Sequence, residues 1–163
     1  MSEYHNTKAE DRVPLGQKLA VGAGGFPIQN GGLIVQYMAQ PIFQIFLGLN
    51  PALFGLAMTI PRIWDAFTDP VMGRISDRTQ SRYGRRRPYV FVGALAVALT
   101  FLTIWMVPQS MGDTGTFLWL TIGSVLFFTA FTVFSVPFNA LVYEQTPDYH
   151  ERTRLMFYLA LFY

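Results

Sequence analysis

The chain has 163 residues, of which 52% are hydrophobic, 16% aromatic and only 13% charged, against about 25% charged residues in an ordinary soluble domain. It contains no cysteine, which excludes disulfides and thiolate metal sites. Residues 19–61, 88–112 and 114–143 contain no Lys, Arg, Asp, Glu or His. Each stretch exceeds the ~20 residues that cross a ~30 Å hydrocarbon core, so we predict an all-α membrane protein that crosses the bilayer several times.

The apolar runs, and the polar, Gly and Pro residues between them, predict a cytoplasmic tail at residues 1–16 and then a bundle of membrane-spanning helices. Asn50-Pro51 is typical of a turn followed by the first residue of a helix. The predicted spans are 17–47, 51–75, 88–107, 116–143 and, incomplete, 155–163.

The last of these segments has nine residues, about half of a crossing. We therefore expect the chain to be the N-terminal part of a longer protein, holding four spans and the start of a fifth. The alternative is a short interfacial helix over 155–163.

The basic residues are distributed asymmetrically along the chain. Eleven of the twelve Lys and Arg residues lie in three blocks, at 8–18, 74–87 and 152–154, and none lies in the connections at 47–52 and 108–116. Basic residues are enriched in cytoplasmic loops of membrane proteins. The pattern predicts a multi-pass protein of the cell (inner) membrane with its N-terminus in the cytoplasm.

Two aspartates interrupt the second predicted span. Asp65 and Asp69 are four residues apart, so they lie on one face of a helix, with Arg62 one turn earlier. An Asp inside a membrane costs about 2.5–3.5 kcal/mol on insertion scales, so its presence indicates a function. We expect the pair to bind a coupling cation, Na⁺ or H⁺, with Arg62 supporting the site. A purely structural ion pair with Arg62 is the alternative.

The loop after this span carries a recognisable motif. Gly73-Arg-Ile-Ser-Asp77-Arg78, followed after five residues by Gly84-Arg-Arg-Arg87, resembles the loop between helices two and three of the major facilitator superfamily. The longer form of the loop, and the preceding R-x-W-D-A-x-x-D-P, resemble the melibiose-permease-like family of glycoside–pentoside–hexuronide:cation symporters. Two further matches are Lys18-Leu-x-x-Gly-x-Gly-x-Phe26 and Val136-Pro-Phe-x-Ala-Leu141.

This resemblance covers residues 17–155 and implies the N-terminal bundle of a transporter with two six-helix halves. It implies that Asp65 and Asp69 hold Na⁺, Li⁺ or H⁺, with Thr68 and Thr132 as further cation ligands. It also implies a cytoplasmic gate that forms and releases during transport. The residues expected in this gate are Gly73, Asp77, Arg78, Arg85 and Arg152.

The arginine run at 85–87 is equally suited to anchoring the loop on anionic lipid. Its position between two spans speaks against a nucleic-acid partner. No catalytic triad, metal motif or phosphate loop is present, so we expect no enzyme activity and no cofactor other than the coupling ion.

The substrate positions fit the family less well. The family's acidic, tryptophan and arginine sugar contacts fall here on Gln29, Ser135, Asn139 and Ala160, which argues against melibiose but not against another sugar. Neutral side chains able to bond sugar hydroxyls are the candidates, although hydrogen bonding between helices is the alternative role. The candidate substrate residues are Gln29, Asn30, Gln36, Ser135 and Asn139.

The predicted function is secondary active symport of a sugar or glycoside with Na⁺ or H⁺. The expected partners are that substrate, the lipid bilayer and the C-terminal half of the same protein, without which we expect no transport. The alternatives are a proton-coupled facilitator of a non-sugar solute and a truncated, non-transporting regulatory product.

Overall fold

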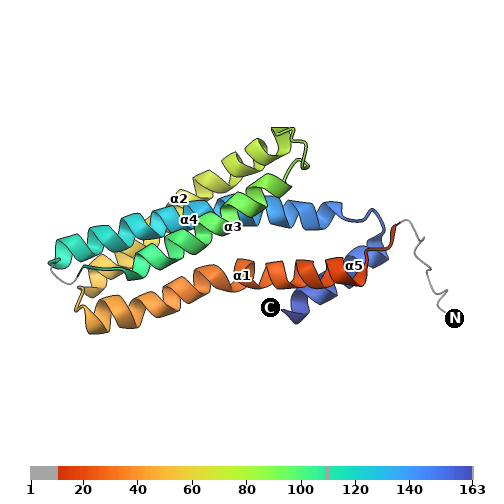
Figure 1. The fold of residues 1–163 in the computed structure, drawn as a ribbon. Helices are drawn as coiled ribbons and strands as arrows, with labels where there is room; N and C mark the ends of the chain where they lie inside the picture. The colour runs from red at the N-terminus through yellow and green to blue at the C-terminus, as the bar shows by residue number, and fades with distance from the viewer. Residues whose placement is uncertain (1–10, 109–110, 163) are drawn as a thin grey trace. The chain divides into compact units, whose positions relative to one another are not determined.

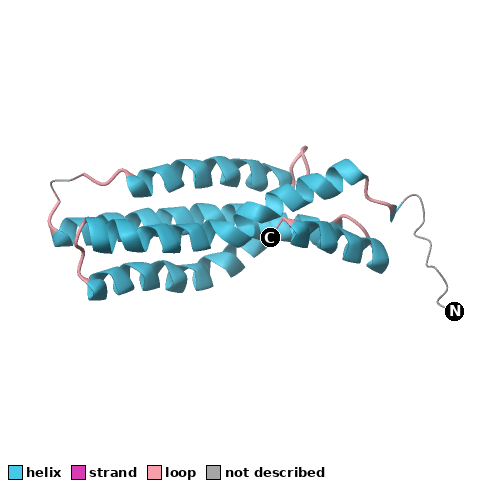
Figure 2. Ribbon diagram, turned by 90° about the horizontal axis from the view of Figure 1, so that it is seen from below, coloured by secondary structure: helices cyan, strands magenta, loops and turns pink. Residues whose placement is uncertain are grey.

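Residues 11–108 and 111–162 are described by a computed structural model. Within these ranges the chain is helical and contains no strand (Figures 1 and 2), which confirms the all-α prediction. The elements in chain order are α1 (Leu15–Ala39), the π-helical segment η2 (Gln40–Phe46), α2 (Pro51–Arg78), α3 (Arg87–Trp105), α4 (Asp113–Glu144) and α5 (Tyr149–Leu161).

The helices belong to two compact units. The first unit includes the beginning of α1, the end of α4 from Asn139, and α5, and the second unit comprises residues 32–138. The candidate cation site lies entirely in the second unit.

The first long helical segment changes its winding at Pro41. Proline has no amide hydrogen and so cannot make the i→i−4 bond of an α-helix, and the chain continues as the wider turns of η2, in which Leu47 donates to the Ile42 carbonyl at 3.0 Å. Gly48 then adopts a φ of 70°, a left-handed conformation that glycine accepts without cost. This glycine ends the segment and lets the chain turn into α2.

Helix α2 begins where the sequence predicts. The Asn50 side chain accepts a hydrogen bond from the Ala52 amide at 2.8 Å, and Pro51 occupies the first helical position. Pro61 and Pro70 lie inside the helix, so the carbonyls of Ala57 and Ala66 lose their usual intrahelical donors.

An apolar cluster forms the core of the second unit and draws on each of its helical segments. Around it, the Trp105 ring packs against Phe43 and Phe101, with ring centroids 6.4 and 5.7 Å apart. Asp65 lies about two turns beyond the cluster along α2. The buried members are Val35, Ala39, Phe43, Leu49, Ala57, Ile104, Leu120 and Phe127.

Two of the described helices are long and apolar enough to cross a membrane, namely α3 and α4, with mean hydropathies of 1.9 and 2.0. Only 11% of the apolar stretch of α3 is buried within the protein, and large side chains such as Phe91 and Leu99 are exposed. Helices α1 and α2 are less hydrophobic; α2 alone carries six charged residues. The membrane spans predicted at 17–47 and 51–75 remain predictions.

Helix α5 starts earlier than the predicted fifth span. It begins at Tyr149, inside the stretch predicted as a cytoplasmic loop, because Asp148 caps it by accepting from the Glu151 amide at 2.9 Å. Within the first unit α1 and α5 approach closely, since a Cβ at Gly22 would lie 2.5 Å from the Phe162 ring.

Candidate cation site and its surroundings

The acidic pair lies in the middle of α2. Asp65 is half-buried and Asp69 is exposed. One carboxylate oxygen of Asp65, Oδ1, is buried and has no hydrogen-bond partner among the described residues. An unpaired carboxylate oxygen away from water is costly unless a proton or cation satisfies it. This oxygen is therefore the strongest indication of a ligand in the second unit.

Helix α4 supplies a hydroxyl to the pair. Thr132 is 2% exposed, and its Oγ1 donates to Asp69 Oδ1 at 2.9 Å. The structure thus brings together two predicted site residues that are 63 positions apart in the sequence.

Thr68, the other predicted ligand, is half-buried and faces its own helix. Its Oγ1 donates to the backbone carbonyls of Trp64 at 3.3 Å and Asp65 at 3.4 Å. The hydroxyl proton is thereby occupied, while the lone pairs of the oxygen stay available to a cation. Carboxylate and hydroxyl oxygens are the ligands that hard cations prefer.

Arg62 does not pair with the aspartates as the structural alternative requires. Its guanidinium donates to the side-chain carbonyl of Gln36 on α1 at 2.6 Å, and no ion pair joins it to either aspartate among the described residues. Gln36, a predicted substrate residue, is therefore a partner of Arg62 in this structure.

Trp64 makes a contact that the sequence did not indicate. Its indole Nε1 donates to Thr129 Oγ1 on α4 at 2.9 Å. The only hint in the sequence is the spacing of Thr129 and Thr132, which places both hydroxyls on one face of α4. These side chains also line an apolar groove of about 400 Å³ along α2 and α4, together with Phe67 and Val71.

The remaining predicted substrate residues are distributed over both units. In the first unit Gln29 and Asn139 are exposed, and Asn30 donates to the Phe26 carbonyl of its own helix at 3.1 Å. In the second unit Ser135 is buried, with 9% of its surface exposed.

An ion pair joins the two ends of the connection between α2 and α3. The exposed Asp77 carboxylate accepts from the Arg86 guanidinium, which is 9% exposed. This hydrogen bond holds the pKa of Asp77 below its usual value. Arg78 and Arg85 are exposed. Asp77 was expected in the loop, but it lies in the last turn of α2, which continues to Arg78, and the sequence did not single out Arg86 as its partner.

Gly73 is half-buried on α2 and faces α4. The nearest atom to a Cβ built at Gly73 is Val136 Cγ1, at 3.9 Å, which is ordinary van der Waals contact. The described structure therefore leaves room for a side chain here.

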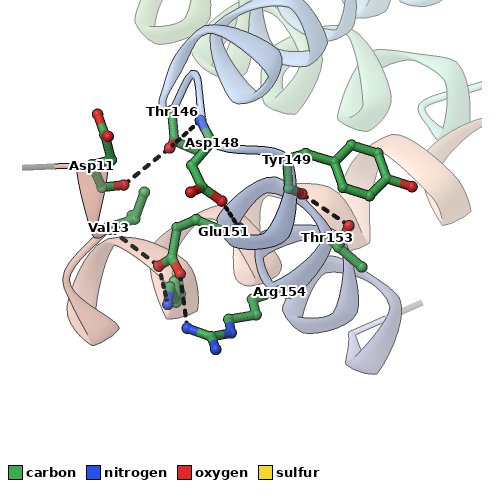
Figure 3. A network of polar contacts seen from close by, with 9 residues as sticks. Asp11, Val13, Thr146, Asp148, Tyr149, Glu151, Thr153 and Arg154 are labelled. Carbon is green, nitrogen blue, oxygen red and sulfur yellow. Dashed lines mark hydrogen bonds and ion pairs between the residues drawn. The ribbon is translucent and has the colours of Figure 1, made fainter. Parts of the chain in front are cut away.

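Arg152, the last predicted gating residue, acts within the first unit. It donates to the Thr146 carbonyl at 3.1 Å, and Thr146 in turn donates to the Asp11 carbonyl at 3.0 Å. The segments before α5 and before α1 are thereby joined (Figure 3).

The neighbouring Glu151 is the centre of this network. Its carboxylate is 1% exposed and accepts from Lys18 at 2.5 Å, from the Val13 amide at 3.2 Å and from Arg154 at 3.3 Å. Figure 3 shows the contacts from Val13 and Arg154. Burial by itself raises the pKa of Glu151, but these bonds outweigh it and the pKa lies below its usual value.

Known proteins resemble this chain over most of its length. The profile of the family described as MFS/sugar transport protein matches residues 20–162. An uncharacterized symporter of Synechocystis sp. is 36% identical over 85% of this chain. The sodium-dependent lysophosphatidylcholine symporter 1-A of Danio rerio is 32% identical over 83% of it.

A third relative is YagG of Escherichia coli, a protein assigned by name to glycoside/cation symport, which is 29% identical over 90% of this chain. The matches cover 26%, 25% and 31% of these three relatives, so the chain spans about a quarter to a third of their length. The match over nearly the whole chain, together with the helical bundle, confirms the resemblance seen in the sequence, and the chain belongs to the MFS/sugar transport protein family.

Proposed function

We propose that the whole protein is a cation-coupled symporter whose cation is held by Asp65 and Asp69, with Thr132 and Thr68 as hydroxyl ligands. The observation that carries this proposal is the buried Oδ1 of Asp65, which has no hydrogen-bond partner in the part of the chain that the structure describes, beside the Asp69–Thr132 hydrogen bond. A cation at this position satisfies that oxygen and offsets the negative charges of the two carboxylates. The sodium-dependent relatives favour Na⁺, and a proton is the other candidate.

Coupling follows from linkage between two sites. When the cation neutralises the carboxylates, α2 and α4 are held together around it, and a substrate that needs this arrangement binds more tightly. By the same linkage the substrate raises the affinity for the cation. Gradient-driven uptake then requires the bundle to alternate its access around the loaded site.

The first candidate substrate is a sugar or glycoside, supported by the family description and by YagG. Its hydroxyls would bond the neutral side chains of Gln29, Asn30, Gln36, Ser135 and Asn139. A lysophospholipid is the second candidate, favoured by the lysophosphatidylcholine symporters among the relatives and by the apolar groove beside the acidic pair.

The charged loop is proposed as the cytoplasmic gate. The Asp77–Arg86 pair closes the connection between α2 and α3, with Gly73, Arg78 and Arg85 close to it in sequence. Arg152 has a corresponding role in the connection before α5. This assignment places the N-terminus and both loops in the cytoplasm, in agreement with the distribution of basic residues.

The deciding experiment is uptake by vesicles that contain the whole protein, with and without a Na⁺ gradient and with and without a pH gradient. The substrate panel contains free sugars, alkyl glycosides and lysophosphatidylcholine. We expect gradient-dependent uptake in the wild type and at least about a tenfold loss of it in Asp65→Asn and Asp69→Asn. Undiminished coupling in both variants would refute the proposed cation site.

Asp113→Asn is the matched control. Asp113 is an exposed aspartate at the start of α4, and the same chemical change there is expected to leave uptake unchanged. Gradient-dependent uptake of a sugar or glycoside would support the first candidate substrate, and gradient-dependent uptake of lysophosphatidylcholine would support the second.

A further inference from the structure

Two hydrogen bonds join α2 to α4 on either side of Asp65. Trp64 Nε1 donates to Thr129 Oγ1 at 2.9 Å, and Thr132 Oγ1 donates to Asp69 Oδ1 at 2.9 Å. The direction of donation is opposite in the two bonds, since α2 is the donor in one and the acceptor in the other. Along α2 the two contacts lie before and after Asp65, whose Oδ1 has no hydrogen-bond partner among the described residues.

The Thr129 hydroxyl is held in a single orientation. It donates to the Val125 carbonyl of its own helix at 2.7 Å and accepts from the Trp64 indole. The indole has one polar hydrogen and no acceptor, so the polarity of this contact cannot reverse. Trp64 is 46% exposed, and the Nε1 bond therefore fixes one edge of a ring that packing alone does not enclose.

Both bonds depend on the rotation of α2 relative to α4. Residue 64 bonds residue 129 and residue 69 bonds residue 132, so the two helices run in the same direction at this point. Turning α2 about its axis moves Asp65 and Trp64 together, because they are adjacent. The Trp64–Thr129 bond is thus one of two hydrogen bonds that restrict the rotation setting where Asp65 points.

We propose that Trp64 and Thr129 are positioning residues that hold Asp65 and Asp69 in the cation-binding arrangement. The proposal rests on the cation site proposed above and adds two residues that do not themselves bind the cation. It predicts that the bond contributes to cation affinity rather than to substrate affinity or to the translocation step.

The test is Thr129→Val in the whole protein, with uptake measured against Na⁺ concentration, or against pH if the proton is the coupling ion. Valine keeps the branched shape and removes the hydroxyl. We expect the cation concentration for half-maximal uptake to rise about 3-fold to 18-fold, the range that corresponds to one interhelical hydrogen bond in a membrane. At saturating cation, the substrate KM and maximal rate are expected to stay within about twofold.

Two variants serve as controls. Thr121→Val makes the same change elsewhere on α4, where the hydroxyl donates to the Phe117 carbonyl of its own helix at 2.8 Å. It is expected to leave the cation dependence unchanged. Thr129→Ser keeps the hydroxyl and is expected to have the wild-type cation dependence.

Trp64→Phe removes the same hydrogen bond from its other side. Both single variants lose the same contact. The cation concentration for half-maximal uptake in the double variant Trp64→Phe/Thr129→Val is therefore expected to be no higher than in the more strongly affected single variant. Additive losses would show that the two residues act independently and would overturn the proposal.

The outcomes separate this inference from the proposed function. Equal cation dependence in Thr129→Val and Thr121→Val, alongside loss of coupling in Asp65→Asn and Asp69→Asn, would overturn the positioning role and leave the cation site standing. Retained coupling in both aspartate variants would overturn the cation site and with it the positioning role.

Discussion

Glu151 shows how one buried charge organises a connection between segments. Its carboxylate contacts Lys18 of α1, the backbone amide of Val13 just before α1, and Arg154 of its own helix α5. A buried carboxylate is costly unless such partners satisfy it. The contacts fix the N-terminal end of α1 against the first turn of α5.

The substitution Glu151→Gln is expected to lower the free energy of unfolding by about 1–3 kcal/mol, because it leaves the Lys18 ammonium without its charged partner. Lys18 is 12% exposed, so water compensates only in part. Arg154→Gln is the control with the smaller expected effect, since Arg154 itself is 54% exposed and Lys18 and the Val13 amide still contact the Glu151 carboxylate. Thermal unfolding in detergent measures both, and equal effects would contradict the buried role of Glu151.

The same residue predicts an acid dependence. The folded-state pKa of Glu151 lies below its ordinary value of 4.5, so the folded state binds the proton less readily than the unfolded state does. The resulting stabilisation is present above that ordinary value and is lost as pH falls through the folded-state pKa. Unfolding temperatures recorded at pH 7 and in steps below pH 4.5 are expected to fall less steeply in Glu151→Gln than in the wild type.

At the scale of the helices, α3 and α4 cross at a glycine. A Cβ at Gly93 would lie 2.7 Å from the backbone N and Cα of Phe134, and backbone atoms cannot move aside without separating the helices. We expect Gly93→Ala to destabilise the protein by about 1–3 kcal/mol, as overpacking does. Gly55→Ala is the control on α2, where no atom of another described segment lies within 4 Å of the new carbon. A loss of the same size there would contradict the crossing argument.

The sequence predicts these helices well because long apolar runs and proline signals are local features. Helix α2 begins at Pro51, and α3 begins one residue before the predicted position 88. The π-helical turns of η2 were not predicted, since they depend on how the chain responds to the missing amide of Pro41. The early start of α5 was also missed, although Asp148 and Glu151 have the spacing of a capping box.

The site was predictable in part for the same reason. The i, i+4 spacing of Asp65 and Asp69 is visible in the sequence, and the resemblance to a known family added Thr132. Partners that depend on three-dimensional packing were not visible. The Trp64–Thr129 bond and the choice of Arg86 by Asp77 follow from helix rotation and loop shape, which composition and spacing do not define.

At the scale of the whole molecule, the surface is as informative as the core. Large apolar side chains are exposed on several helices, with Ile45 at 80%, Phe46 at 77% and Phe91 at 69%. A soluble monomer rarely exposes wide apolar areas, and membership of a transporter family accounts for this surface through contact with lipid and neighbouring helices.

The orientation in the membrane is testable with thiols introduced one at a time, because residues 1–163 contain no cysteine and the same protein without the introduced thiol gives the background labelling. Gln80 is exposed in the basic α2–α3 loop, and Gly112 is exposed in the α3–α4 connection. Basic loops stay in the cytoplasm, so we expect a membrane-impermeant maleimide to label Gly112→Cys in intact cells and to label Gln80→Cys only after lysis.

Gly16→Cys, before the first predicted span, is expected to behave like Gln80→Cys. Labelling of Gln80→Cys but not Gly112→Cys in intact cells would reverse the orientation. Labelling of both would mean that α3 does not cross the bilayer.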